Sequence, residues 1–257
     1  MIRSLVAIPI YNEQKYLLGV LSMVRRYAGD ILAIDDGSTD QTPELLDAQA
    51  GLHVIHHPRN LGYGQSMIDA FAFALERGYD WVITIDCDLQ HRPCRIPAFL
   101  HQAARDDADV ISGSRYLDIG VPGDLPPEDR RRINFKMTGL INERLGLSLT
   151  DAFCGFKAYR VSAMARLRLT EPGYAFPMQF WVQAAAAGLR IREIPVTLIY
   201  NDPNRRFGDG LDDAHRRLNH YLDVFYQELH AAASGADESS MVSEASGASC
   251  CRPCRKP

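Results

Sequence analysis

The fold of this chain is decided near its N-terminus, by the stretch Leu5-Val6-Ala7-Ile8-Pro9-Ile10-Tyr11-Asn12-Glu13. A short apolar run that ends in polar residues is typical of a buried strand, so we expect a strand over residues 5–10. Apolar side chains at helical spacing follow between residues 13 and 27, at Tyr16, Leu17, Val20, Leu21 and Val24. The stretch therefore predicts a strand followed by a helix, which is the repeating unit of an α/β fold.

The same alternation continues along the N-terminal half of the chain. Apolar runs predict further strands over residues 31–34, 54–56, 81–85 and 110–112, and helical spacing predicts a helix over residues 64–77. Strands that alternate with helices form a parallel sheet through right-handed crossovers. We therefore expect an α/β domain in which helices flank a mostly parallel central sheet.

The pattern becomes looser after residue 116. A loop rich in glycine, proline and charge is expected over residues 118–132, with helices over residues 133–145, 176–187 and 211–230 and strands over residues 155–159 and 191–200. From residue 231 to 257 the composition has few large apolar residues, which predicts a disordered tail. The chain is thus expected to form a single domain over residues 1–230, with two halves at 1–116 and 117–230.

The composition excludes several classes of protein. The 257 residues carry a formal net charge of −4, which gives no general attraction to nucleic acid or to an anionic membrane. No apolar run approaches the roughly 20 residues that a membrane-spanning helix needs. The six cysteines do not resemble the disulfide framework of a secreted protein, since three of them crowd into the last eight residues. We expect a cytoplasmic protein that does not bind nucleic acid.

Two carboxylates and an amide follow the strand expected over residues 81–85, at Asp86, Asp88 and Gln90. Alternating positions of an extended segment can converge their oxygen atoms on one cation, and oxygen-only ligation suits Mg²⁺ or Mn²⁺. Such an ion would bridge the two phosphates of a nucleoside diphosphate and offset the charge on a leaving group. The alternative interpretation of this segment is a solvated acidic turn.

Polar residues also follow the first two expected strands. Asp36 comes just after residues 31–34, where a carboxylate can accept hydrogen bonds from a nucleobase or a ribose. Tyr11 and Glu13 follow the first strand, where an aromatic ring can stack on a base. Ligands of open α/β sheets bind at the carboxyl ends of the strands, so these residues are expected to share a site. The alternatives are a capped turn at Asp36 and a helix N-terminus at Glu13.

The order and spacing of these motifs resemble those of the family 2 glycosyltransferases, which have the GT-A fold. The resemblance spans about residues 3–208 and continues through Asn60-Leu61-Gly62, Gly113-Ser114-Arg115-Tyr116, Asp151, residues 155–160 and Glu193-Ile194-Pro195-Val196. Within the family, the chain is most similar to the dolichol- or polyprenol-phosphate mannosyltransferase branch. The resemblance implies a GT-A domain in which residues 1–116 bind a nucleotide-sugar and residues 117–230 face the acceptor.

The resemblance also implies a role for each motif residue. The nucleotide-sugar would contact Pro9, Tyr11, Glu13, Asp36 and Asp86. The metal, Mg²⁺ or Mn²⁺, would be held by Asp86, Asp88 and Gln90, and the catalytic residues would be Asp88, Asp151 and Arg115. An acceptor phosphate would be bound by Arg115 and by further arginines, with Arg131 and Arg132 of the triplet 130–132 and Arg206 as the candidates.

The implied reaction is transfer of a hexose from a GDP- or UDP-linked sugar in a single displacement that inverts the anomeric carbon. Family members usually carry a glutamate where this chain has Gln179, and a glutamine cannot act as a general base. An anionic polyprenyl phosphate needs little help from a base, so it is the expected acceptor, and the enzyme is expected to be peripheral to the membrane. The alternatives are a soluble alcohol acceptor, with Asp151 as the base, and a non-catalytic module that binds nucleotide-sugars.

Overall fold

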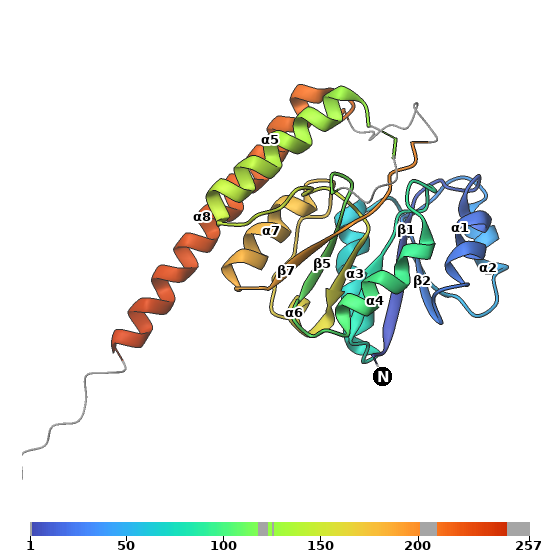
Figure 1. Ribbon diagram of the computed structural model, residues 1–257, viewed down its shortest axis with the longest axis horizontal. Coiled ribbons are helices and arrows are strands. Elements are labelled where there is room, and N and C mark those ends of the chain that lie inside the picture. Colours follow the sequence, from blue (N-terminus) through green and yellow to red (C-terminus); the bar gives the residue numbers. More distant parts are fainter. Residues whose placement is uncertain (1, 118–122, 125, 201–209, 246–257) are drawn as a thin grey trace, which may run out of the picture.

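The computed structural model describes residues 2–117, 123–124, 126–200 and 210–245, with side chains to residue 234. Within these residues the chain forms an α/β fold around a seven-stranded sheet, whose strand order is β3-β2-β1-β4-β6-β5-β7 (Figure 1). The strands are β1 Ser4–Ile10, β2 Asp30–Asp35, β3 His53–His56, β4 Trp81–Thr84, β5 Val110–Ser114, β6 Lys157–Arg160 and β7 Ile191–Pro195. The expectation of a mostly parallel central sheet is confirmed.

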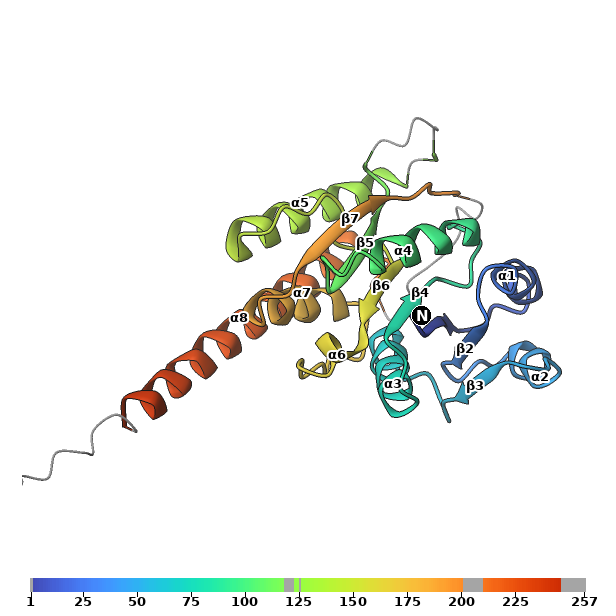
Figure 2. The ribbon, with the colours of Figure 1, turned by 60° about the horizontal axis from the view of Figure 1, so that its bottom comes forward.

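Helices cover both faces of the sheet (Figure 2). The helices are α1 Leu17–Val24, α2 Thr42–Asp47, α3 Tyr63–Glu76, α4 Ile96–Ala103, α5 Glu128–Leu145, α6 Val161–Met164, α7 Phe176–Ala186 and α8 Ala214–Ala245, with a 3-10 turn at Pro93–Arg95. One core layer joins α1, α2 and α4 to the sheet, and the other joins α3, α5, α6, α7 and α8 to its opposite face. The two layers account for the apolar strands, which are buried on both sides.

The strand β6 runs antiparallel to both of its neighbours, β4 and β5, whereas the other paired strands run parallel. Lys157, the first residue of β6, is opposite Thr84 of β4 and Ser112 of β5. Because of this reversal, β6 begins at the edge of the sheet where the parallel strands end. Residues that precede β6 in the chain are therefore brought beside the motifs that follow β1, β2, β4 and β5.

Some expected elements differ from the structure in their extent. The loop expected over residues 118–132 is wrong for its last five residues, because α5 begins at Glu128. Glu128 and Asp129 lie in the first turn of that helix, where acidic side chains are stabilised by the helix dipole. The strand expected over residues 191–200 ends at Pro195, which lies opposite Ser114, the last residue of its partner strand β5. The sequence pattern also missed α4 and α6, which are short.

The helix α8 extends past the expected start of the tail. It runs from Ala214 to Ala245, so residue 231 falls inside a helix, and Ala232 packs against the core. Along part of its length α8 lies beside α5 (Figure 1). Residues 246–257, with their three cysteines, lie outside the described residues, and the boundary between the halves at residue 116 stays a prediction.

Candidate active site

A cavity of about 1090 Å³ lies at the edge of the sheet where the parallel strands end. The predicted site residues that line it are Pro9, Tyr11, Glu13, Asp36, Asp86, Asp88, Gln90 and Arg115. They lie at or just after the carboxyl ends of four different strands, and they are brought together because those ends share one edge of the sheet. The cavity is large enough for a ligand of the size of a nucleotide-sugar.

The loop after β4 turns sharply at the candidate metal ligands. Leu89 has a φ of 59°, in the left-handed region that a leucine rarely adopts, and Asp88 Oδ1 accepts the N–H of Gln90 at 2.9 Å. Asp88 is only 4% exposed, so the segment is not the solvated acidic turn of the alternative interpretation. A strained turn of this kind persists only where the surrounding structure holds it, and here it directs Asp88 and Gln90 into one cavity.

The donor set at the end of β4 fits a hard divalent cation. It offers two carboxylates and one amide oxygen, and the described residues hold no group of three or more His, Cys, Asp and Glu side chains that would form a protein-only cage. Mg²⁺ characteristically binds one or two carboxylates and completes its coordination with water and substrate phosphates. The backbone of Gly155 packs directly against Asp86. A Cβ at residue 155 would come within 2.4 Å of Asp86 Oδ2, so only glycine leaves room for this carboxylate.

Asp36 is held by the protein on both of its oxygen atoms. Oδ1 accepts the N–H of Leu61 at 2.8 Å and bonds His57 Nδ1 at 2.7 Å, and Oδ2 accepts the N–H of Gly62 at 2.9 Å. His57 bonds Asp69 through its other nitrogen, at 2.8 Å. Asp36 thus positions the loop at residues 60–62, which also lines the cavity. Its direct contact with a nucleoside stays a prediction.

The ends of β1 and β2 are joined by side-chain contacts. Asn12 has a φ of 55°, donates its N–H to Ser38 Oγ at 2.9 Å, and accepts the N–H of Thr39 on Oδ1 at 2.8 Å. The N–H of Glu13 is donated to Thr42 Oγ1. The carbonyl oxygen of Glu13 accepts the N–H groups of Tyr16 and Leu17, so Glu13 belongs to the turn that leads into α1 and also lines the cavity. The two loops form a single wall of the cavity.

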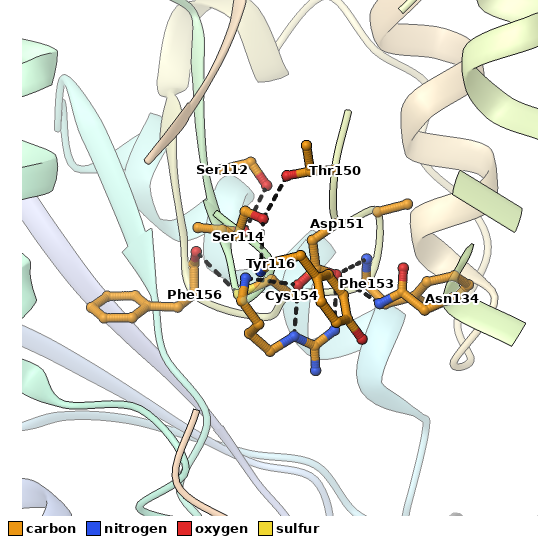
Figure 3. A network of polar contacts seen from close by, with 12 residues as sticks. Ser112, Ser114, Tyr116, Asn134, Thr150, Asp151, Phe153, Cys154 and Phe156 are labelled. Atoms are coloured by element: carbon orange, nitrogen blue, oxygen red, sulfur yellow. Dashed lines mark hydrogen bonds and ion pairs between the residues drawn. The ribbon is translucent and has the colours of Figure 1, made fainter. Parts of the chain in front are cut away.

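Arg115 and Asp151 form a bidentate ion pair next to β5. Figure 3 shows Asp151 with its partner Asn134. The guanidinium Nε and Nη2 lie 2.6 and 2.8 Å from the two carboxylate oxygens, and Asp151 also accepts from Asn134 Nδ2 and from the N–H of Phe153. Burial alone would raise the pKa of Asp151, but the charge and hydrogen bonds of Arg115 hold it well below its usual range. Asp151 is therefore a stable anion that fixes the guanidinium.

The structure favours a positioning role for Asp151 over the expected role as a base. Its side chain is fully buried, and the residue does not line the cavity, whereas Arg115 does. Both oxygens already accept hydrogen bonds, so a proton from an acceptor hydroxyl would have to displace Arg115. Glu193 supports the pair from β7, since its carboxylate accepts the N–H groups of Thr150 and Asp151.

The arginines expected to bind an acceptor phosphate are separated by the geometry of α5. Arg130 lines the main cavity, whereas neither Arg131 nor Arg132 does. Arg132 lines a second, smaller cavity of about 360 Å³ between α5 and α8. The three arginines are separated because successive residues of a helix point about 100° apart, and contact of Arg131 and Arg132 with an acceptor phosphate stays a prediction. Arg206 lies outside the described residues.

Arg217 lines the cavity although it belongs to none of the motifs, whereas Gln179, at a position where the family usually has a glutamate, does not line it. Arg217 of α8 is 2% exposed and lines the cavity, and its Nη2 donates to Asp129 of α5 at 2.7 Å. Its position in α8 is decided by long-range packing, which the sequence pattern did not reveal. Gln179 does not line the cavity: it accepts the N–H groups of Thr170 and Glu171 and donates to Glu228. Its identity therefore carries no information about a general base.

Comparison with known proteins identifies the family to which the chain belongs. The family described as "Glycosyl transferase family 2" matches residues 5–168. The undecaprenyl-phosphate mannosyltransferase of Micrococcus luteus is 34% identical over 206 residues, which are 77% of this chain and 84% of that protein. The polyprenol monophosphomannose synthase of Mycolicibacterium smegmatis is 31% identical over 207 residues, 76% of this chain and 77% of the other.

Solved structures are similar in fold. Glucosyl-3-phosphoglycerate synthase from Mycobacterium tuberculosis, in complex with phosphoglyceric acid, superposes with a TM-score of 0.70 at 16% identity, over 89% of this chain and 80% of that one. The same protein in complex with Mn²⁺, UDP-glucose and phosphoglyceric acid has a TM-score of 0.68. At this identity the likeness concerns the fold, which is of the GT-A type.

Proposed function

Since the chain belongs to glycosyl transferase family 2, we propose that it transfers a hexose from a nucleotide-diphosphate sugar to a polyprenyl phosphate. One observation carries the proposal: the acidic end of β4 and the cationic Arg115 after β5 line the same cavity. A donor diphosphate and an acceptor phosphate are both anionic, so they need separate counter-charges on either side of the transferred sugar. A cation held by Asp86 and Asp88 would supply the positive charge for the donor diphosphate. Arg115 would supply the positive charge for the acceptor phosphate.

On the donor side, Pro9, Tyr11 and Glu13 form the wall for the nucleoside, and Asp36 holds the loop opposite. Asp86, Asp88 and Gln90 would hold Mg²⁺ or Mn²⁺, which supplies positive charge to the leaving diphosphate. Asp88 keeps its hydrogen bond to the N–H of Gln90, so the donor atoms are held in place before substrate arrives. Pre-positioned charges of this kind act most strongly where the transition state builds up charge.

On the acceptor side, Arg115 and Arg130 would bind the phosphate of the lipid. A phosphate oxygen forms the new bond to the anomeric carbon while the bond from that carbon to the diphosphate breaks, and the nucleoside diphosphate leaves with the electron pair. The attacking oxygen is already anionic and needs no base, which agrees with Asp151 being engaged by Arg115. The names of the two bacterial relatives, both polyprenyl-phosphate mannosyl enzymes, support this acceptor class.

The proposal places the enzyme at a membrane surface, on the cytoplasmic side where nucleotide-sugars are available. None of the helices in the described part of the chain is long and apolar enough to cross a bilayer. Contact with the lipid would therefore be peripheral. Arg132 and Lys136 are exposed on α5, outside the main cavity, and are available for contact with anionic headgroups.

The test is a two-acceptor assay with labelled GDP-mannose or UDP-glucose and Mn²⁺. One arm contains polyprenyl phosphate in detergent, and the other contains a soluble cell extract. We expect label in the organic phase of the first arm, reduced at least tenfold by Arg115→Ala and by Arg130→Ala. Label that stays in the aqueous phase, with a rate insensitive to both substitutions, would overturn the lipid acceptor and favour a soluble one.

A further inference from the structure

Part of the cavity is lined by residues that none of the motif roles explains. Tyr63 and Ser66 of α3 line it on one side, and Lys157 and Tyr159 of β6 line it on the other. Residues three apart on a helix share a face, and so do residues two apart on a strand, so the two pairs look toward each other. Phe71 of α3 packs on the ring of Tyr159 at 5.0 Å, so α3 reaches β6 on this face of the sheet. We call these four residues the inner subsite.

Ser66 presents an unused polar group to this space. Its side chain is fully buried, it lines the cavity, and its Oγ has no hydrogen-bond partner. An unsatisfied buried hydroxyl is destabilising, and such groups are rare in native proteins. The hydroxyl of Ser66 is accounted for if a polar ligand completes its hydrogen bond.

Lys157 presents a buried cation to the same space. It is 3% exposed, its Nζ donates to the carbonyl oxygen of Cys154, and it lies 5.6 Å from the ring of Trp181. An ammonium group has three donors, so the single carbonyl leaves capacity for a ligand. Burial lowers the pKa of Lys157, while the charges of Asp151 and Asp86 oppose that change. A lysine in such a place is costly for folding, which favours a role in binding.

The order of the strands indicates which part of the substrate meets the inner subsite. Across the sheet the sequence is β2, β1, β4, β6 and β5. The proposed nucleoside wall follows β1 and β2, the metal ligands follow β4, and Arg115 follows β5. The sugar must lie between the diphosphate and the attacking phosphate, so its position is over the start of β6, where Lys157 lies.

We propose that the inner subsite binds the hexose of the donor, with Ser66 Oγ and Lys157 Nζ hydrogen-bonded to its hydroxyl groups and the rings of Tyr63 and Tyr159 packed against its C–H groups. The inference rests on the proposed function and adds the residues that select the sugar. Polar groups set in aromatic walls are the usual lining of small-molecule sites. A site that hydrogen-bonds a substrate hydroxyl also discriminates strongly against an analogue that lacks it.

The first experiment compares Ser66→Ala with a matched control, Ser112→Ala. Ser112 is also fully buried, but it donates to the carbonyl oxygen of Gly113 and does not line the cavity. Calorimetry in the presence of Mn²⁺ would measure the Kd of each protein for GDP, UDP, GDP-mannose and UDP-glucose. For the nucleotide-sugar that binds, we expect Ser66→Ala to raise Kd about tenfold, while Kd for the free nucleoside diphosphate is unchanged. Ser112→Ala is expected to leave both affinities unchanged.

The melting temperature separates binding from a structural role. Removing a hydroxyl that has no partner, in a helix where alanine is favoured, leaves the melting temperature of Ser66→Ala unchanged or higher. A merely structural serine would give lower stability together with weaker sugar binding. Ser66→Val provides a second readout, because its added methyl groups occupy the subsite and should block the nucleotide-sugar while the nucleoside diphosphate still binds.

Monodeoxy analogues of the donor sugar complete the test. The analogue that lacks the hydroxyl bound by Ser66 should bind wild type about tenfold more weakly than its parent, and should bind Ser66→Ala as well as its parent does. The proposal is overturned if, for every analogue, the ratio of its affinity to that of the parent donor is the same in Ser66→Ala as in wild type. If no nucleoside diphosphate binds wild type in the presence of Mn²⁺, it is the proposed function itself that fails.

Discussion

Gly155 lies so close to Asp86 that an added Cβ would come within 2.4 Å of Oδ2 and 2.8 Å of Oδ1. The two residues are far apart in sequence and belong to the segments that end β4 and begin β6. The carboxylate therefore rests on the bare backbone of the neighbouring strand. The absence of a side chain at residue 155 is thus a condition for the position of Asp86.

Gly155→Ala is expected to displace the Asp86 carboxylate and to weaken Mn²⁺ binding in the presence of nucleoside diphosphate by at least tenfold. The matched control is Gly139→Ala on α5, where a Cβ meets nothing within 4 Å. That control should gain up to about 1 kcal/mol of stability from helix propensity, with Mn²⁺ affinity unchanged. Calorimetric titration with Mn²⁺ should be carried out on wild type and on both variants. An Mn²⁺ affinity of Gly155→Ala equal to that of wild type would contradict a steric role for Gly155.

Asp88→Asn is expected to reduce the rate of sugar transfer at least a hundredfold while the fold persists. The amide oxygen of asparagine can still accept the N–H of Gln90, so the strained turn at Leu89 keeps its support. What is lost is the negative charge that a divalent cation requires. The transfer rate and the melting temperature should be measured together. A variant that stays near wild-type activity after EDTA treatment would refute a metal role for Asp88.

Asp36→Ala is expected to affect both the donor loop and stability. It removes the acceptor of the N–H groups of Leu61 and Gly62 and leaves His57 without one of its partners. Loss of these buried contacts should cost about 1–3 kcal/mol of the free energy of unfolding. Donor affinity should fall about tenfold, because the loop that faces the nucleoside loses its anchor. Donor affinity that is unchanged in calorimetry would mean that this loop takes no part in binding.

Arg115→Lys is expected to raise KM for the lipid phosphate at least tenfold with little change in Kd for the donor. Lysine keeps the charge but cannot make the two parallel hydrogen bonds to Asp151. The control is Arg132→Lys, since Arg132 lines the second cavity and not the main one. Initial rates at varied acceptor concentration measure the effect. An acceptor KM that Arg115→Lys leaves unchanged would place the phosphate elsewhere.

Asp109 gives a prediction about stability and pH. Hydrogen bonds from Arg190 lower the pKa of Asp109 from 3.8 to about 2 in the folded chain. A lowered carboxyl pKa contributes stability that is fully present above pH 3.8 and is lost as pH falls through about 2. Asp109→Asn should therefore lower the free energy of unfolding at neutral pH, by an amount that solvent screening of the exposed Arg190 keeps small. Chemical unfolding of both proteins should show this difference shrinking at acid pH.

A difference between wild type and Asp109→Asn that stayed constant down to pH 2 would mean that the ion pair with Arg190 contributes nothing through the charge of Asp109.

The sequence by itself predicted the parallel part of the sheet and the residues that line the proposed donor half of the site. Short apolar runs predicted β1, β2, β3, β4 and β5, because strands buried on both faces must be apolar along their length. The polar residues that follow β1, β2 and β4 could be assigned to one site for a topological reason: parallel strands end at a common edge. Local pattern was sufficient there, since each motif directly follows the strand that positions it.

Only the tertiary structure decided which residues line the proposed acceptor side and the proposed inner subsite. The reversal of β6 places Gly155 against Asp86, and the ion pair of Asp151 with Arg115 joins residues 36 positions apart. Which arginine of α5 enters the cavity depends on how that helix is rotated against α7 and α8. The free hydroxyl of Ser66 and the burial of Lys157 depend in the same way on packing between α3 and β6. Contacts between distant segments have no period or spacing in the sequence, because burial and packing of the whole chain determine them.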